Sequence, residues 1–369
     1  MTDFVFQPML TCIGNKRKLL DSIEAVVEKV KTSLGKTKLV IMDGFAGSTV
    51  VSRMFMSHAS MLHTNDAEEY SVEMCKCFLQ KPDEEAQLII KDFIESMNQV
   101  AQKGPFVEGV VSKLYAPRDT ENIRKGERCF YTRKNALIID TMRKYIEDNV
   151  TENLRPYCLA PLLVKASIHT NTSGVFKGFH KANGIGCFGG AGRNALKRIT
   201  RPIRVVMPVW YSGDTKVTCH HGDINRVLSD TKQEFDLIYL DPPYNQHPYG
   251  SNYFMLNVIL ENKEPKALSK VSGIPRDWRK SEYNYRSKAK KAMKDLLRQA
   301  TAKSKYVLIS YNDEGIITDE EWEVLLEPYQ SERIEIEYDT FKGSRNLRDR
   351  NSKVIEIMYL VNYAGRSSS

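Results

Sequence analysis

The stretch FDLIYLDPPY, from Phe235 to Tyr244, decides the class of fold. Its first six residues are mostly apolar and β-prone, which is typical of a strand buried on both faces of a parallel sheet. Pro242 and Pro243 cannot continue a hydrogen-bonded ladder, so we expect the strand to stop at Asp241. In open α/β sheets, ligands bind outside the carboxyl ends of the strands. The stretch therefore predicts an α/β protein in which a strand end offers a carboxylate, a carbonyl and an aromatic ring to a ligand.

Upstream segments predict the opening half of a doubly wound sheet. A strand over residues 38–43 leads through a glycine-containing loop into a helix, and a second strand over 61–66 is followed by a helix over 68–79. This strand–loop–helix–strand order is typical of doubly wound folds. Further predicted strands, the last two as a closing antiparallel hairpin, cover residues 216–219, 306–310, 333–339 and 354–361.

The alternation of strands and helices breaks off in the middle of the chain. Between residues 82 and 204 the pattern is mainly helical, and residues 171–192 hold seven of the 21 glycines. Such a glycine-rich loop can approach a ligand closely. We therefore predict a catalytic sheet domain over 1–81 and 205–369, with residues 82–204 as an insertion.

Positive charge is concentrated in two windows. The net charge is +8, yet residues 276–305 hold eleven Lys and Arg against three acids, and residues 175–204 hold seven against none. Phe176, Phe179 and Phe188 are interleaved with the basic residues of the second window. A basic run can be a solvated helix face, but basic residues among aromatic ones suit a polyanion with exposed bases. We therefore expect a nucleic acid partner.

Cysteine usage and hydropathy exclude several classes of protein. The seven cysteines are scattered and contain no CxxC pair, which favours a reduced cytoplasmic compartment and argues against zinc. His220 and His221 have no further Cys or His at ligand spacing, so no metal site is predicted. The chain has no apolar run of membrane-spanning length, and its N-terminus lacks the basic start of a secretory signal.

Three further acids follow predicted strands. Asp43 opens the loop DGFAGS, which matches neither the dinucleotide pattern nor the P-loop pattern. Asp66 ends the next strand, where a carboxylate can bind ribose hydroxyls or simply cap the following helix. Asp223 follows a strand as well, with the cap as the alternative. Together the DGFAGS loop and Asp66 favour an adenosine-containing cofactor without a long phosphate chain.

Taken together, the motifs resemble a known family. CIGNKRKLL (residues 12–20), DGFAGS (43–48) and DPPY (241–244), with a long insertion before the last, are similar to S-adenosylmethionine-dependent DNA adenine N6-methyltransferases of the Dam-like (alpha) class. The resemblance implies a Rossmann-like class I methyltransferase sheet with a closing β-hairpin, interrupted by a mainly helical target-recognition insertion. Similarity to the branch of restriction–modification enzymes that includes the FokI methyltransferase rests on residues 130–143, 161–181 and 252–257.

The resemblance also implies S-adenosyl-L-methionine as the cofactor. The N-terminal motif is expected near its methionine part, Phe45 and Gly47 beside it, Asp66 at its ribose, and Asp223 with Ile224 at its adenine. The family has an aromatic residue where this sequence has Cys12. The full expected set is Cys12, Gly14, Asn15, Lys16, Asp43, Phe45, Gly47, Asp66, Asp223, Ile224 and Asp241.

The DPPY residues Asp241, Pro242, Pro243 and Tyr244 suit chemistry at an exocyclic amine. The lone pair of adenine N6 is delocalised into the ring, and accepting hydrogen bonds from both N6 hydrogens localises it. The Asp241 carboxylate and the Pro242 carbonyl can supply the two acceptors, because proline brings no competing N–H donor. Tyr244 can stack on the target base once it is rotated out of the duplex.

Dam-like enzymes place target recognition in the insertion. Residues 171–181 offer amides, hydroxyls and cations that can reach base edges or phosphates, although a purely structural loop is the alternative. The expected DNA contacts are Asn171, Thr172, Lys177, Lys181, Arg193, Lys197, Arg198 and Arg201.

The sequence thus predicts a cytoplasmic, site-specific methyltransferase for adenine N6 in double-stranded DNA, as the modification enzyme of a restriction–modification system with a cognate endonuclease as partner. The alternatives are methylation of cytosine N4 in DNA, of adenine in RNA or of glutamine in a protein, and a catalytically silent DNA-binding subunit. Aspartate at position 241 favours adenine, since related cytosine and glutamine enzymes more often carry serine or asparagine there. The intact DPPY and cofactor loop argue against the silent subunit.

Overall fold

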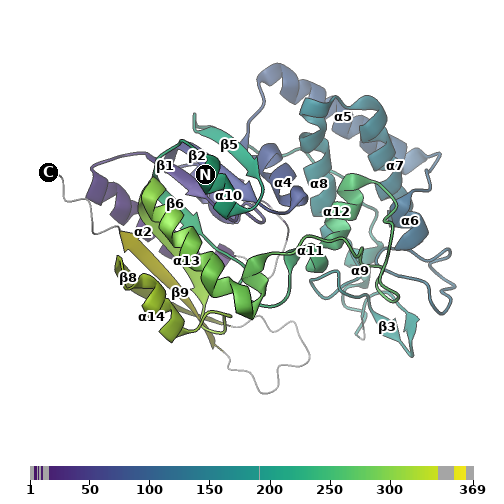
Figure 1. Ribbon diagram of the computed structural model, residues 1–369. Coiled ribbons are helices and arrows are strands. Elements are labelled where there is room, and N and C mark those ends of the chain that lie inside the picture. The colour runs from purple at the N-terminus through teal and green to yellow at the C-terminus, as the bar shows by residue number, and fades with distance from the viewer. Residues whose placement is uncertain are drawn as a thin grey trace.

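The computed structural model describes residues 4–5, 7, 10, 16–190, 192–339 and 353–362. Within these residues the chain forms a seven-stranded sheet flanked by helices and, beside it, a lobe made mainly of helices (Figure 1). The strands are β1 Leu39–Asp43, β2 Ala59–Asp66, β5 Lys216–His221, β6 Phe235–Leu240, β7 Ser304–Asn312, β8 Gln330–Asp339 and β9 Lys353–Asn362.

The sheet has the strand order β5-β2-β1-β6-β7-β9-β8. The first five strands in this order are parallel, whereas β9 runs antiparallel to both β7 and β8. The predicted α/β sheet and its closing hairpin are therefore confirmed. The hairpin places the last strand, rather than the one before it, next to β7.

Each face of the sheet buries its own hydrophobic core. Leu237 and Tyr239 of β6 pack on one side with α2 (Leu20–Leu34) and α3 (Val50–Phe55). The alternate residues Ile238 and Leu240 pack on the other side, because successive side chains of a strand point to opposite faces. That second side is covered by α10 Ile224–Asp230, α13 Arg286–Lys303 and α14 Asp319–Leu326.

The helical lobe has a third core. Its helices are α4 Glu69–Leu79, α5 Glu84–Lys103, α6 Val110–Leu114, α7 Arg133–Asn149, α8 Arg155–Ile168 and α12 Phe254–Glu261. The core joins side chains of α5, α7 and α8 to side chains of α4 and α12. The lobe therefore includes elements from outside residues 82–204, and α12 returns to it after β6 has been completed (Figure 1).

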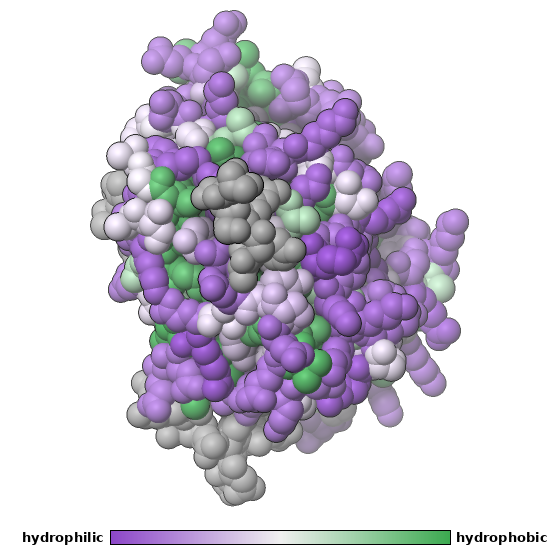
Figure 2. All heavy atoms as spheres, turned by 60° about the vertical axis from the view of Figure 1, so that its left-hand side comes forward, coloured by the Kyte–Doolittle hydropathy of each residue, from purple (hydrophilic) through white to green (hydrophobic). Residues whose placement is uncertain are grey.

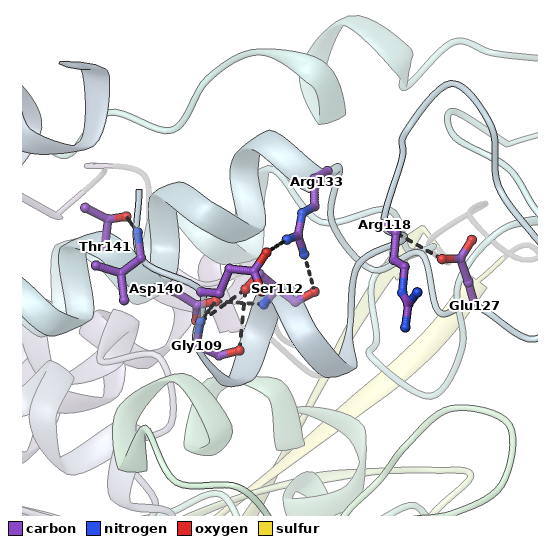
Figure 3. Close-up of polar contacts among 9 residues, drawn as sticks. Gly109, Ser112, Arg118, Glu127, Arg133, Asp140 and Thr141 are labelled. Carbon is purple, nitrogen blue, oxygen red and sulfur yellow. Dashed lines mark hydrogen bonds and ion pairs between the residues drawn. The ribbon is translucent and has the colours of Figure 1, made fainter. Parts of the chain in front are cut away.

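A buried carboxylate fixes the start of α6 in this lobe. Asp140 of α7 accepts hydrogen bonds from the backbone N–H groups of Gly109, Val111 and Ser112, at 2.8–3.0 Å (Figure 3). The first N–H groups of a helix have no backbone acceptor within it, and a carboxylate at this end also interacts favourably with the helix dipole. Asp140 thus ties two helices of the lobe together, away from the sheet edge that holds the DGFAGS and DPPY motifs.

Short elements complete the fold. They are η1 Lys16–Leu19, η2 Glu152–Leu154, β3 Lys181–Ala182, β4 Ile185–Gly186, α9 Leu196–Thr200, α11 Tyr249–Asn252 and η3 Glu282–Asn284. The small β3–β4 hairpin lies within the glycine-rich segment, for which no strand was predicted. On the face shown in Figure 2, hydrophilic residues predominate and hydrophobic ones occur in small groups, so the described residues form no broad apolar patch there.

Candidate active site

Four acidic residues meet at one edge of the sheet. Asp43 ends β1, Asp66 ends β2, Asp223 follows β5 and Asp241 follows β6. The carboxyl ends of parallel strands share one edge, so residues far apart in the sequence line a single cavity there. The cavity is partly open to solvent and is lined by apolar side chains together with a few polar and acidic ones, as small-molecule sites commonly are.

The glycine loop is held against this edge by Asp66. Gly47 has a positive φ of 52°, and its N–H donates to Asp66 Oδ2 at 2.7 Å. Asp66 Oδ1 accepts from the N–H of Glu68 at 2.8 Å. The neighbouring Gly44 allows the loop to lie close to β6, because a Cβ there would be 2.9 Å from Leu240 Cδ2. The positive φ therefore favours glycine at position 47, whereas a larger residue at position 44 would require the Leu240 side chain to shift.

Burial raises the pKa of the acids in the cavity wall. Asp43 is 1% exposed, and although Ser52 Oγ donates to its Oδ2 at 2.5 Å, burial raises its pKa to about 7. The pKa of Asp66 is raised by burial as well, against the opposing effect of its backbone hydrogen bonds. Because burial raises the pKa of both carboxyls, the charge of this cavity wall depends on pH and on the bound ligand.

A buried cation links Asp241 to the closing hairpin. Lys16 Nζ lies 2.9 Å from Asp241 Oδ1 and 2.9 Å from Glu356 Oε1. Burial by itself would lower the pKa of Lys16, but the two carboxylates outweigh it and raise the pKa well above its usual value. Burial raises the pKa of Asp241 to about 6; Lys16 opposes this shift and Glu356 adds to it.

The DPPY loop leaves β6 at the cavity. Pro242 is buried, and Pro243 lines the cavity with Asp241. The ring of Tyr244 is half-buried and meets Tyr311 edge-on, with ring centroids 6.4 Å apart. The Tyr244 carbonyl accepts from the N–H of Ile316 at 2.8 Å, which fixes the end of the loop. The centroid of this ring lies 5.7 Å from Nζ of Lys16, which lines the cavity. The Tyr244 ring therefore lies beside the cavity.

An apolar slot lies on the β5 side of the cavity. Phe45 and Tyr283 pack edge to face with ring centroids 5.5 Å apart, and Ile224 is buried beside them. Asp223 lines the cavity too, and it also caps α10, since its Oδ1 accepts from the N–H groups of Asn225 and Arg226. A carboxylate has acceptor sites left after such a cap, so capping and ligand contact are compatible.

Several cavity residues were missed by the sequence analysis. Glu68 is 7% exposed, burial raises its pKa to about 7, and it accepts from Asn257 Nδ2 at 2.8 Å. Its position two residues after Asp66, at the end of a predicted strand, could have indicated in the sequence that Glu68 lies at the cavity. Asn284 and Arg279 come from a segment between strands that carries no strand-end signal. Hydrogen bonds to distant residues hold that segment at the cavity: the Tyr283 hydroxyl donates to Asn225 Oδ1 at 2.6 Å, and the Asn284 amide donates to the Asn245 carbonyl.

The donor and acceptor groups of the cavity fit an adenosine-containing methyl donor. The buried Oδ1 of Asn284 has no hydrogen-bond donor within reach among the described residues, although Nδ2 of the same residue donates to the Asn245 carbonyl at 2.7 Å. An unmatched acceptor and the Asp66 carboxylate suit the hydroxyl and amine donors of such a molecule, and the aromatic slot suits its base. Three of the predicted contacts, Cys12, Gly14 and Asn15, lie outside the described residues.

The predicted DNA contacts divide into two groups. Asn171 and Thr172 are buried, and the Asn171 amide donates to the carbonyls of Cys129 and Cys187 while its Oδ1 accepts from the Gly189 N–H. The Arg198 guanidinium donates to the carbonyls of two residues at the end of α8, Ile168 and Thr170. These geometries favour the structural alternative for Asn171, and they show that the Arg198 guanidinium is engaged within the protein. The exposed members of the set are Lys177, Lys181, Arg193, Lys197 and Arg201.

Two absences concern only the described part of the chain. Within it, no group of three or more His, Cys, Asp or Glu side chains could hold a metal ion. Over the same residues, no helix is both long and apolar enough to cross a membrane.

The strand order and the acidic strand ends around one cavity define a Rossmann-like α/β fold with a ligand site at the carboxyl edge of its sheet. The chain belongs to the D12 class N6 adenine-specific DNA methyltransferase family, whose sequence model matches residues 13–324. It is therefore an adenine-specific DNA methyltransferase, and the family implies a methyl donor of the S-adenosylmethionine type. This assignment confirms the resemblance drawn from the motifs and favours adenine in DNA over cytosine N4 or an RNA substrate.

Relatives of known name share most of the chain. The type II methyltransferase M.CviAII of Paramecium bursaria Chlorella virus 1 is 29% identical over 86% of this chain and 87% of its own length. M.NlaIII of Neisseria lactamica is 26% identical over 92% of this chain and 95% of its own. M.FokI of Planomicrobium okeanokoites is 25% identical over 86% of this chain but only 46% of its own.

Proposed function

We propose that the protein transfers a methyl group from S-adenosyl-L-methionine to N6 of an adenine flipped out of double-stranded DNA. The observation that carries the proposal is the position of Asp241, which lies at the end of β6 in the same cavity as Asp43, Asp66 and the aromatic slot. The carboxylate that would accept a hydrogen bond from the target amine therefore lies beside the site that would hold the nucleoside of the cofactor. S-adenosyl-L-methionine supplies an electrophilic methyl group on its sulfonium when it is bound.

The residues of the chain have separate tasks in this proposal. Asp66 binds the ribose hydroxyls, and Phe45 with Ile224 encloses the adenine of the cofactor. Asp241 and the Pro242 carbonyl accept hydrogen bonds from the two N6 hydrogens of the target base. As the amine becomes tetrahedral, these acceptors stabilise the positive charge that develops on nitrogen, which is the largest kind of contribution a polar group makes to catalysis.

Contacts with the segment that follows the DPPY loop support a role of residues 171–192 in target recognition. Lys177 Nζ lies 3.3 Å from Nδ1 of His247, three residues beyond Tyr244. The Lys177 carbonyl accepts from Ser272 Oγ at 2.5 Å. The loop that carries the exposed cations therefore lies beside the catalytic loop, where a duplex must pass if one of its bases enters the cavity.

The enzyme is further proposed to be the cytoplasmic modification component of a restriction–modification system, with a cognate endonuclease as partner. The names of the relatives support this proposal, since M.CviAII, M.NlaIII and M.FokI are type II methyltransferases. All six cysteines in the described residues are free thiols, which suits a reducing compartment.

Nucleoside analysis tests the function directly. Purified protein is incubated with unmethylated plasmid and S-adenosyl-L-methionine, and the modified nucleosides are identified and mapped. We expect N6-methyladenine in one sequence context, with no modification of single-stranded RNA used as a control. N4-methylcytosine as the product, or methylation of RNA but not of DNA, would contradict the proposal.

For the recognition loop, we expect Asn171→Ala to reduce stability rather than change specificity. The substitution leaves two backbone carbonyls and one N–H without their partner, which should lower the free energy of unfolding by about 1–3 kcal/mol. Lys177→Ala should leave stability unchanged and alter DNA binding. Denaturant unfolding and methylation maps at two salt concentrations separate these effects, with Ser173→Ala as an exposed control. A relaxed target sequence in a stable Asn171→Ala protein would restore the role of Asn171 as a base reader.

A further inference from the structure

A buried cation between two carboxylates stands behind the catalytic loop. Lys16 of η1 is 4% exposed and lies 2.9 Å from carboxylate oxygens of both Asp241 and Glu356. Glu356 belongs to β9 and is 1% exposed, and its Oε1 also accepts from Ser310 Oγ of β7 at 2.7 Å. Three distant segments of the chain are thus joined at Lys16.

Such a cluster is costly to bury. Desolvation of each ion must be offset by close partners, and removal of one partner leaves an uncompensated buried charge. Glu356 is absent from the cavity wall formed by the described residues, so it does not reach a ligand there. It also lies beyond residues 13–324, the part of the chain that matches the family. The reaction described above therefore gives no direct reason for an acid at this position.

We propose that Glu356 is a positioning residue, which restrains the Lys16 ammonium so that it engages one oxygen of Asp241 and leaves the other oxygen to the target amine. An ammonium has three donors and no acceptor. With Glu356 in place, one donor is committed to β9, and Lys16 meets Asp241 through Oδ1. Without it, Lys16 is free to move onto Asp241 and compete with the amine for the carboxylate. This inference rests on the proposed role of Asp241.

The charges around Asp241 determine how its pKa changes when Glu356 or Lys16 is removed. The groups that interact electrostatically with Asp241 are Lys16, Glu356, Tyr239 and Asp43, and Tyr244 acts on Lys16. Glu356 raises the pKa of Asp241 and Lys16 lowers it, both on top of the larger effect of burial. Loss of the Glu356 charge should therefore shift the acid limb of kcat/KM to lower pH. Loss of Lys16 should shift it to higher pH, because two buried carboxylates then face each other.

The test compares Glu356→Gln, Lys16→Met and the double variant. We expect Glu356→Gln to lower kcat by about tenfold, the low end of the roughly 10–100-fold loss seen when the outer partner of a metal-binding side chain is removed. KM values for DNA and cofactor should stay within about twofold, since no binding contact is removed. Lys16→Met should lose more activity, and the double variant should recover part of that loss, because Glu356 is then no longer buried as an unpaired charge.

Controls distinguish a positioning role from a structural one. Glu332→Gln, the same substitution on the neighbouring strand β8 at an exposed pair with Lys29, should leave kcat and the acid limb unchanged. Thermal unfolding is measured for every variant. Wild-type kcat in Glu356→Gln, or a loss of kcat with no shift of the acid limb, would overturn the inference. If Lys16→Met does not fold, Glu356→Gln alone decides. Full activity of Asp241→Ala would instead overturn the proposed function.

Discussion

Asp241→Ala is expected to abolish methylation while cofactor binding stays within a few-fold of the wild type. The carboxylate is proposed to accept a hydrogen bond from the target amine, and loss of an electrostatic group of this kind typically costs roughly a hundred- to a thousand-fold or more in turnover. The fold should survive, because Lys16 keeps Glu356 as a partner at 2.9 Å and is not left as an unpaired buried cation.

Single-turnover methylation of a cognate duplex measures this effect, and equilibrium binding of labelled S-adenosyl-L-methionine provides the control. In the wild type, the acid limb of kcat/KM should lie near the Asp241 pKa of about 6, since the protonated carboxyl can no longer accept from the amine. If Asp241→Ala kept more than half of the wild-type rate, the catalytic assignment would be wrong.

The second large effect is expected for Tyr244→Ala. The ring lies beside the cavity and contacts Tyr311 edge-on, and its backbone is fixed through Ile316. We propose that the ring stacks on the flipped adenine, and stacking of a base on an aromatic side chain is worth about 1–3 kcal/mol. The variant should therefore lose about five- to 140-fold in kcat/KM for DNA, a factor of ten for each 1.4 kcal/mol.

Tyr244→Phe is the matched control, because it keeps the ring and removes only the hydroxyl. Its rate should remain close to that of the wild type. A duplex with 2-aminopurine at the target position reports base flipping through its fluorescence, and the signal should change for Tyr244→Ala and persist for Tyr244→Phe. Equal damage in both variants would show that the hydroxyl, rather than stacking, is essential.

Much of the site followed from local patterns in the sequence. A strand ended by two prolines is recognisable wherever it occurs, and the stretch predicted at Phe235–Leu240 is β6 with the same bounds. Parallel strands bring their carboxyl ends to one edge, so the positions of Asp43, Asp66 and Asp241 at strand ends were enough to group them. The order of the motifs then indicated the family. Each of these steps depends on residues close together in the chain or on a general rule of sheet topology.

The remaining features depend on contacts between distant segments. Lys16 and Glu356 lie at opposite ends of the chain, and only the insertion of β9 beside β7 brings them together. The apolar faces of α4 and α12 are buried in the core of the helical lobe. The sequence of residues 82–204 alone does not show that these two helices belong to the lobe.

Exposure, too, was decided by the tertiary structure. In the sequence, Asn171 and Lys177 are equally suited to contact DNA. In the structure, the Asn171 amide forms its hydrogen bonds with backbone groups inside the protein, whereas the Lys177 side chain lies at the surface. The type of a polar residue determines which hydrogen bonds it can form. Only the packing around that residue decides whether the protein or a ligand provides the partner.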